Sequence, residues 1–171
     1  MAITLLVGGA RSGKSARALQ LASAWEGQVV FVATAEARED EEMAARITRH
    51  RLERPASWRT IEAPVDLVRA FDSIPSRAFV VLDCLTLWVA NALEAGWRDE
   101  EVERAAAAVA TIAASREQPT VVVTNEVGLG LVPQTPLGRS FRDLLGRVNA
   151  VFAAEAEQAY LMIAGRTLEL T

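Results

Sequence analysis

The stretch Gly8-Gly9-Ala10-Arg11-Ser12-Gly13-Lys14-Ser15 satisfies the phosphate-binding pattern G-x-x-x-x-G-K-[ST] at every position. It follows an apolar run over residues 3–7 and opens an amphipathic helical pattern over residues 13–25, which is the context that such a loop requires. Glycines let the backbone wrap around phosphate oxygens, and the free N–H groups of a helix start attract anions. The loop therefore predicts a nucleoside triphosphate site, in which Lys14 reaches the β- and γ-phosphates and the Ser15 hydroxyl ligates Mg²⁺.

Apolar strands alternate with helical patterns along the rest of the chain. Further strands are expected at residues 29–33, 79–82 and 120–123, and a β-hairpin at 160–163 and 168–170. Helices are expected at 39–50, from Pro64 to about 70, at 85–93, at 99–115 with Asp99 as N-cap, and at 137–156. Strands that are apolar throughout indicate an α/β fold, a P-loop NTPase with a mostly parallel sheet, helices on both faces and a C-terminal hairpin. No repeat or linker is evident, so residues 1–171 are expected to form a single domain.

The net charge, the cysteine content and the apolar stretches predict which partners, sites and cellular setting the protein has. The net charge of -4 disfavours nucleic acid as a partner, because binding a phosphate backbone needs a cationic surface. Cys84 is the one cysteine, so neither an internal disulfide nor a zinc site of the usual spacing is expected, and a reducing, cytoplasmic setting is predicted. Cys84 itself is expected to be a packed core thiol. The longest apolar stretch, residues 79–93, is shorter than the roughly 20 residues of a membrane span, and the N-terminus lacks the basic region of a signal peptide.

Asp83 directly follows the apolar run at 79–82. A P-loop protein needs a second acid for Mg²⁺ at the end of a neighbouring strand, and Asp83 has that position. The alternative is that Asp83 caps the following helix.

Lysine and histidine are each used once, as Lys14 and His50, although the chain has 17 arginines. A guanine-reading N-K-x-D motif needs a lysine outside the loop, so a standard GTPase switch is not expected. For His50 taken alone, a polar residue near a helix C-terminus is the simpler interpretation.

An ordered set of motifs resembles the bifunctional adenosylcobinamide kinase/adenosylcobinamide-phosphate guanylyltransferases of cobalamin biosynthesis, over nearly the whole chain. The matching segments are the loop at 8–15, Ala33-Thr34, 42–47 followed by His50, Arg54-Pro55, 58–60, Glu62, 124–128, Gly130, Val132-Pro133, 141–143 and 146–149.

The resemblance implies two reactions and a RecA-like fold. Adenosylcobinamide would be phosphorylated with ATP or GTP, and GMP from GTP would then be transferred to the resulting phosphate. A histidine that matches His50 would carry the GMP covalently, which divides a difficult transfer into two steps. Members of the family are typically homotrimers. Because of this match, His50 is interpreted as a nucleophile and not merely as a polar residue near a helix C-terminus.

The resemblance also implies nucleotide contacts beyond the loop. These are Ala33, Thr34, Ala35, Arg51, Leu52, Glu53, Arg54, Glu62 and Asp83. The sequence departs from the family pattern at three places: Ala35 stands where a serine can occur, residues 51–54 lack a glycine often seen there, and Asp83 stands where a glutamate can occur.

Three hypotheses remain open from the residues. The first is the bifunctional kinase and guanylyltransferase, the second a plain P-loop kinase without a covalent step, and the third a nucleotide-binding regulatory or assembly module without turnover. Asn125 and Glu126, at the end of a predicted strand, are expected either to orient substrate or to shape the loop that follows. Arg142 with Asp143 is either surface charge or a subunit contact. The four tryptophans are expected in core packing, with an interface or a corrinoid surface as the alternative.

Overall fold

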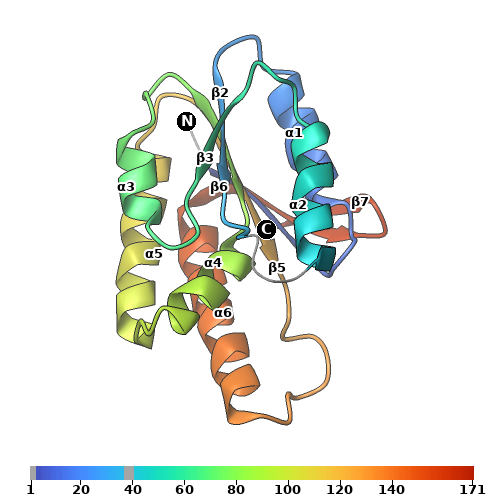
Figure 1. The fold of residues 1–171 in the computed structure, drawn as a ribbon, viewed down its shortest axis with the longest axis vertical. Helices are drawn as coiled ribbons and strands as arrows, with labels where there is room; N and C mark the ends of the chain where they lie inside the picture. The colour runs from blue at the N-terminus through green and yellow to red at the C-terminus, as the bar shows by residue number, and fades with distance from the viewer. Residues whose placement is uncertain (1–2, 37–40) are drawn as a thin grey trace.

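Seven strands form one sheet in the computed structural model, which describes residues 3–36 and 41–171 (Figure 1). The strands are β1 (Ile3–Gly8), β2 (Val29–Ala33), β3 (Arg59–Glu62), β4 (Phe79–Asp83), β5 (Thr120–Asn125), β6 (Ala156–Ile163) and β7 (Arg166–Leu170). Their order across the sheet is β3-β2-β4-β5-β1-β6-β7. All neighbouring pairs are parallel except β6 and β7, which form the expected antiparallel C-terminal hairpin.

Helices cover both faces of this sheet. They are α1 (Lys14–Ser23), α2 (Glu41–Leu52), α3 (Leu67–Asp72), α4 (Leu85–Glu94), α5 (Asp99–Ala114) and α6 (Pro136–Glu155). Figure 1 shows α1 and α2 on one side and α3 to α6 on the other. The α/β fold with a mostly parallel sheet, predicted from strands that are apolar throughout, is confirmed.

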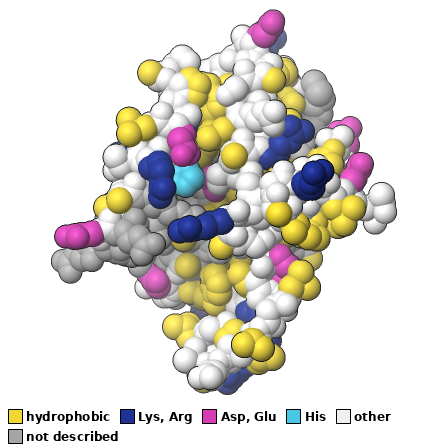
Figure 2. Space-filling model, turned by 90° about the vertical axis from the view of Figure 1, so that its right-hand side faces the viewer, with side chains coloured by type: hydrophobic (Ala, Val, Ile, Leu, Met, Phe, Trp, Pro, Cys, Tyr) yellow, Lys and Arg dark blue, Asp and Glu magenta, His cyan; other side chains and the backbone are white. Residues whose placement is uncertain are grey.

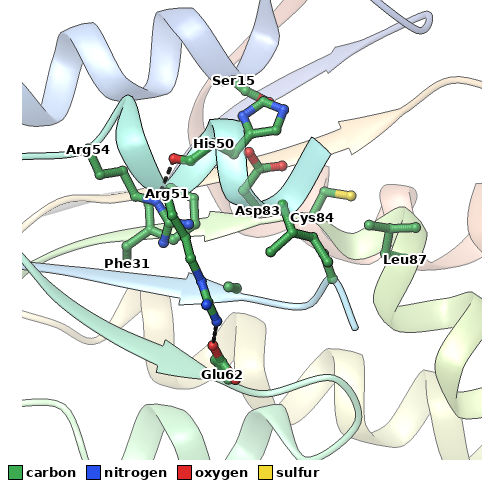
Figure 3. Close-up of a pocket in the computed structure, with 12 residues that line it drawn as sticks. Ser15, Phe31, His50, Arg51, Arg54, Glu62, Asp83, Cys84 and Leu87 are labelled. Carbon is green, nitrogen blue, oxygen red and sulfur yellow. Dashed lines mark hydrogen bonds and ion pairs between the residues drawn. The ribbon is translucent and has the colours of Figure 1, made fainter. Parts of the chain in front are cut away.

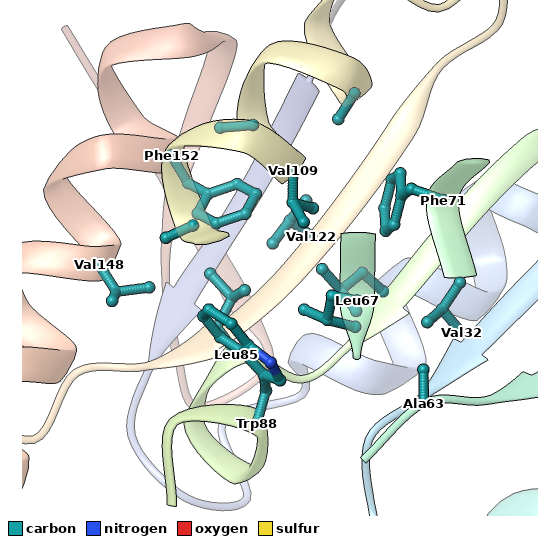
Figure 4. Close-up of a cluster of buried hydrophobic side chains, with 14 of the residues drawn as sticks. Val32, Ala63, Leu67, Phe71, Leu85, Trp88, Val109, Val122, Val148 and Phe152 are labelled. Carbon is teal, nitrogen blue, oxygen red and sulfur yellow. The ribbon is translucent and has the colours of Figure 1, made fainter. Parts of the chain in front are cut away.

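Each face of the sheet has its own hydrophobic cluster. The larger one lies under α3 to α6 and includes Leu67, Trp88, Val109, Val122 and Phe152 (Figure 4). The smaller one lies under α1 and packs Ala18 and Ala22 against the other face of the strands. Inner strands buried on both faces explain why the sequence shows apolar runs there rather than alternation.

The tryptophans pack as expected. Trp88 is fully buried and donates its indole N–H to the Val65 carbonyl at 2.7 Å. Trp25, Trp58 and Trp97 are partly buried against the two clusters, and the Trp25 ring lies 5.8 Å from that of Phe79.

Three sequence-based expectations were wrong. Strand β3 was missed, because it lies at the sheet edge with three of its four residues exposed and has no apolar run. Pro64 does not begin a helix; α3 begins at Leu67, after Asp66 accepts a hydrogen bond from the Arg69 N–H as N-cap.

Asp99 is not the N-cap of α5, because Arg98 occupies that position and Glu101 closes the capping box. Asp99 and Glu103 instead bind the Arg147 guanidinium at 2.7 and 2.6 Å, which joins α5 to α6. Residues 39–40 of the helix expected at 39–50 lie outside the described residues.

No described helix is both long enough and apolar enough to cross a membrane.

Truncating the core aromatic residue of α6 tests the larger cluster. Phe152 is fully buried, so Phe152→Ala is expected to lower the free energy of unfolding by about 3–5 kcal/mol, through lost transfer energy and a residual cavity. Phe141→Ala, on the same helix but only partly buried, is the matched control and should lose less. Urea unfolding measures the free energy of unfolding of both variants. Equal losses would contradict the packing of Phe152 in the larger cluster.

Candidate nucleotide site

The loop between β1 and α1 requires glycine at two positions. A Cβ on Gly8 would lie 2.4 Å from the Met162 carbonyl oxygen, so strand β6 passes too close for any side chain. Gly13 has a φ of 99°, in the left-handed region, and Arg11 also has a positive φ of 56°. Residues with positive φ that alternate with residues of negative φ turn successive N–H groups toward one point, which is how such loops bind anions.

Lys14 is folded back onto this loop. Its ammonium donates to the carbonyls of Gly8 and Gly9 at 2.8 and 2.6 Å and lies 3.2 Å from the Ser12 hydroxyl. The side chain is buried. The hairpin turn supports the loop from the other side, because the Gly165 N–H donates to the Ser12 carbonyl. The cation is therefore held at the loop, where phosphates would bind.

Strand register brings the ends of β2, β3 and β4 together. Ala33 pairs with Asp83 on one side and with Glu62 on the other. All three strands run parallel, so their carboxyl ends lie on the same side of the sheet. The loop after β1 lies on that side too, and we call this side the carboxyl edge.

A pocket opens at this edge (Figure 3). It brings together Ser15 of the loop, Ala33 at the end of β2 and Ala35 after it, His50, Arg51 and Arg54 from α2 and its end, Glu62 of β3, and Asp83 of β4. Eight residues predicted from sequence thus line one cavity, although they come from five segments of the chain.

His50 lies at the mouth of this pocket on the last turn of α2, with its imidazole turned toward Ser15 and above Asp83 (Figure 3). Figure 2 shows the histidine at the surface, next to both basic and acidic side chains. The imidazole Nδ1 lies 3.3 Å from the Glu53 carboxylate. The histidine therefore faces the same space as the loop and the second acid.

Arg54 fastens the end of α2 to the sheet. Its guanidinium donates to the His50 carbonyl at 2.9 Å and to the Thr60 hydroxyl at 3.1 Å, and lies 4.1 Å from the centre of the Phe31 ring. Burial and the neighbouring Arg51 lower the pKa of Arg54, while Asp83 and Glu62 oppose this shift. Arg51 forms an ion pair with Glu62 across the pocket.

Other residues predicted to contact nucleotide lie outside the pocket lining. The Thr34 side chain is buried and bridges the backbone of Cys84, accepting from its N–H and donating to its carbonyl, both at 2.8 Å. Leu52 is 82% exposed. Gly9, Ala10 and Arg11 are exposed on the loop, and the Glu53 carboxylate lies against His50. The Thr34 side chain thus ties the end of β2 to the residue after β4.

Sequence reasoning missed the apolar part of the lining, which is Phe31, Ile47 and Leu87, with Cys84 beside them. Phe31 could have been predicted from the sequence. It stands two residues before Ala33 on a predicted strand, so both side chains lie on one face. Ile47 stands three residues before His50 and shares its helix face. No sequence pattern predicts that Leu87 lines the pocket, because its helix meets the pocket through tertiary packing.

The residues after β5 shape the backbone. The Glu126 carboxylate accepts a hydrogen bond from the Gly128 N–H, which supports the loop-shaping alternative. The backbone of Asn125 is bound by Thr86 and Asn149. Arg142 is paired with Asp143, its neighbour in sequence.

Asp83 does not cap α4, because Cys84 is the N-cap and no side chain provides the cap hydrogen bond. No group of three or more metal-binding His, Cys, Asp or Glu side chains occurs among residues 3–36 and 41–171. Ser15 and Asp83 in one pocket nevertheless fit Mg²⁺, which usually takes one or two protein ligands and completes its shell with water and phosphate.

The second acid was expected on a strand next to the loop strand, but β5 separates β4 from β1. A glycine loop after the first strand, a lysine held on it and an acid at the end of a parallel strand of the same sheet define a P-loop nucleotide-binding protein of the α/β class. Solved structures agree with this fold. A prototypical ATPase from the type III secretion system of pathogenic bacteria superposes with a TM-score of 0.62 at 9% identity, over 98% of this chain and 56% of the ATPase. A KaiC-like protein from Pyrococcus horikoshii superposes with a TM-score of 0.55 at 16% identity, over 94% and 70% of the two chains.

The family follows from sequence comparison. Residues 4–170 match the family described as cobinamide kinase / cobinamide phosphate guanyltransferase, and the chain belongs to this family. The bifunctional adenosylcobalamin biosynthesis proteins CobU of Escherichia coli and Salmonella typhimurium are 42% and 43% identical, each over 94% of this chain and 95% of the relative. The protein CobP of Pseudomonas aeruginosa, with the same description, is 37% identical over 97% and 95%. The resemblance inferred from the motifs is confirmed, and the chain is a kinase and guanylyltransferase.

Alkylation of the single thiol tests the lining of the pocket. Burial, and then the neighbouring Asp83, raise the pKa of Cys84 from 9.0 to about 11, so at neutral pH the native thiol has roughly a hundredfold less thiolate than a free one. We expect iodoacetamide to modify the native protein about a hundredfold more slowly than the unfolded chain, with the rate rising up to about pH 11. Equal rates in the native and unfolded states, measured by mass spectrometry, would contradict this environment.

Proposed function

We propose that this enzyme phosphorylates the aminopropanol hydroxyl of adenosylcobinamide with ATP or GTP and then transfers GMP from GTP to that phosphate. The GMP would pass through a covalent adduct on His50, and the products would be adenosylcobinamide-GDP and pyrophosphate. The observation that carries the covalent route is the position of His50, in one pocket with Ser15 and Asp83.

The guanylyl transfer balances as two displacements at one phosphorus. An imidazole nitrogen of His50 attacks the α-phosphorus, and the bond to the bridging oxygen breaks with its electron pair leaving on pyrophosphate. An oxygen of adenosylcobinamide phosphate then attacks the same phosphorus, and the nitrogen–phosphorus bond breaks with its electrons returning to the imidazole. Lys14 and the loop N–H groups would stabilise the charge that develops on pyrophosphate.

In the kinase step the same loop would hold the triphosphate while the substrate hydroxyl attacks the γ-phosphorus. Ser15 and Asp83 would hold Mg²⁺, which when bound neutralises phosphate charge. Lys14 would exchange its contacts with the Gly8 and Gly9 carbonyls for phosphate oxygens. This exchange keeps the cation paired in both states.

The apolar lining supplies a surface for the nucleobase. Phe31 and Leu87 lie apart from Ser15 of the loop (Figure 3), and Ile47 lines the same pocket. Arg51 and Glu62 are paired at the same cavity, and the nucleotide would compete for this pair. The proposal includes assembly as a homotrimer, which the family resemblance implies, and a cytoplasmic setting, which the single cysteine predicts.

Labelled GTP separates the three hypotheses. With α-labelled GTP we expect the protein to retain label in an adduct that is labile in acid and stable in base, because a phosphoramidate has those properties. A His50→Ala variant should retain none. With γ-labelled GTP and adenosylcobinamide, label should move to the corrinoid.

A plain kinase would transfer the γ-label and retain no α-label. A binding module without turnover would bind GTP and transfer neither. Adduct formation undiminished in His50→Ala would show that the nucleophile is another residue.

Removing the second acid tests the metal site. Asp83→Asn keeps the shape of the side chain but removes its charge, so we expect the Mg²⁺ concentration for half-maximal activity to rise and the rate to fall by about 10- to 100-fold. Asp72→Asn, an exposed acid at the end of α3, is the matched control and should behave like the unmodified enzyme. An unchanged Mg²⁺ titration in Asp83→Asn would remove Asp83 from the metal site.

A further inference from the structure

The Glu53 carboxylate lies against the ring of the nucleophile proposed above. Its Oε2 atom is 3.3 Å from the Nδ1 atom of His50. The two residues are three apart in sequence, and the Glu53 N–H still donates to the Arg49 carbonyl, so the helical turn continues far enough to place both on one face. Both side chains are partly exposed, at 33% for His50 and 46% for Glu53.

His50 is restrained at two points. Arg54 binds its carbonyl, and Arg54 is in turn fixed by the Phe31 ring and the Thr60 hydroxyl. Glu53 approaches the imidazole itself. With the backbone fixed, the contact at Nδ1 decides which ring nitrogen remains for the ligand.

The other acids of the pocket are placed differently. Glu62 is paired with Arg51. Asp83 lies at the end of β4, below the imidazole in Figure 3, and no ion pair between it and His50 is found among the described residues. In the described part of the chain, Glu53 is the acid within ion-pair distance of the histidine.

We propose that Glu53 is the positioning residue of His50: it keeps the proton on Nδ1 and so leaves the Nε2 lone pair as the one that attacks the α-phosphorus. The proposal rests on the covalent route proposed above. A carboxylate accepts but does not donate at neutral pH, so it favours the tautomer that carries hydrogen on the nitrogen facing it.

The same contact assists both displacements. When Nε2 bonds to phosphorus, the ring holds a positive charge as long as Nδ1 keeps its proton, and the Glu53 carboxylate stabilises that charge. When the acceptor phosphate attacks, the nitrogen–phosphorus bond breaks, its electrons return to Nε2, and the ring is again neutral with hydrogen on Nδ1. No proton has to leave the ring during the cycle.

The single histidine makes the tautomer directly measurable. After labelling with ¹⁵N-histidine, a long-range ¹H–¹⁵N spectrum of the whole enzyme contains one imidazole and needs no assignment. Recorded at about pH 8.5, where an ordinary imidazole is neutral, it should show protonated Nδ1 and unprotonated Nε2. In Glu53→Ala we expect the signals to shift toward the Nε2–H form, which ordinary imidazole prefers.

Kinetics supply the second measurement. For Glu53→Ala we expect the rate of adduct formation at saturating α-labelled GTP to fall about tenfold, with little change in the GTP concentration for half-maximal rate. Glu53→Gln should lose only about threefold, because its amide oxygen still accepts from Nδ1–H. Glu155→Gln removes the same charge at the exposed end of α6 and should leave the rate unchanged.

The outcomes separate this proposal from the function on which it rests. If the unmodified enzyme forms no adduct, or if His50→Ala still forms one, the covalent route is wrong. If the adduct forms on His50 but Glu53→Ala keeps both the rate and the tautomer, the positioning role is wrong and the covalent route stands. A fall in rate with an unchanged tautomer would also overturn the positioning role.

Discussion

Parallel strands end at the same edge of a sheet, and the site depends on this constraint. β1 ends at Gly8, β2 at Ala33 and β4 at Asp83, so the phosphate loop and the second acid share one edge although some 70 residues separate them. Gly8 is also crowded at this end of β1. Strand β6 runs beside β1, and its Met162 carbonyl leaves no room for a Cβ on residue 8.

Polar contacts join the end of α2 to the carboxyl edge of the sheet. Arg54 binds the sheet through Phe31 and Thr60, and Arg51 reaches Glu62 on β3. Contacts of this kind between partly exposed groups are individually weak, since solvent screens them.

Elements with an apolar signature were predictable, and those without one were not. The inner strands β2, β4 and β5 are buried on both faces, so their positions are visible as apolar runs. β3 is polar and exposed at the edge, and only pairing with β2 makes it a strand. The N-cap of α5 was misplaced by one residue, because Asp99 is a typical N-cap residue but is bound by Arg147 of α6, a contact between segments far apart in sequence.

The sequence by itself determined the class of fold, the phosphate loop and the family, because each of these is carried by residues close together along the chain or by an ordered set of motifs. Only the tertiary structure decided which predicted residues share a cavity. It turned the Thr34 hydroxyl onto the Cys84 backbone and Leu52 toward the outside, and it set Glu53 against His50. The physical reason is that side-chain direction depends on strand register and helix placement. Strand pairing joins segments far apart in the chain, such as Ala33 with Glu62 and Asp83, and these pairings are not visible in any local stretch of sequence.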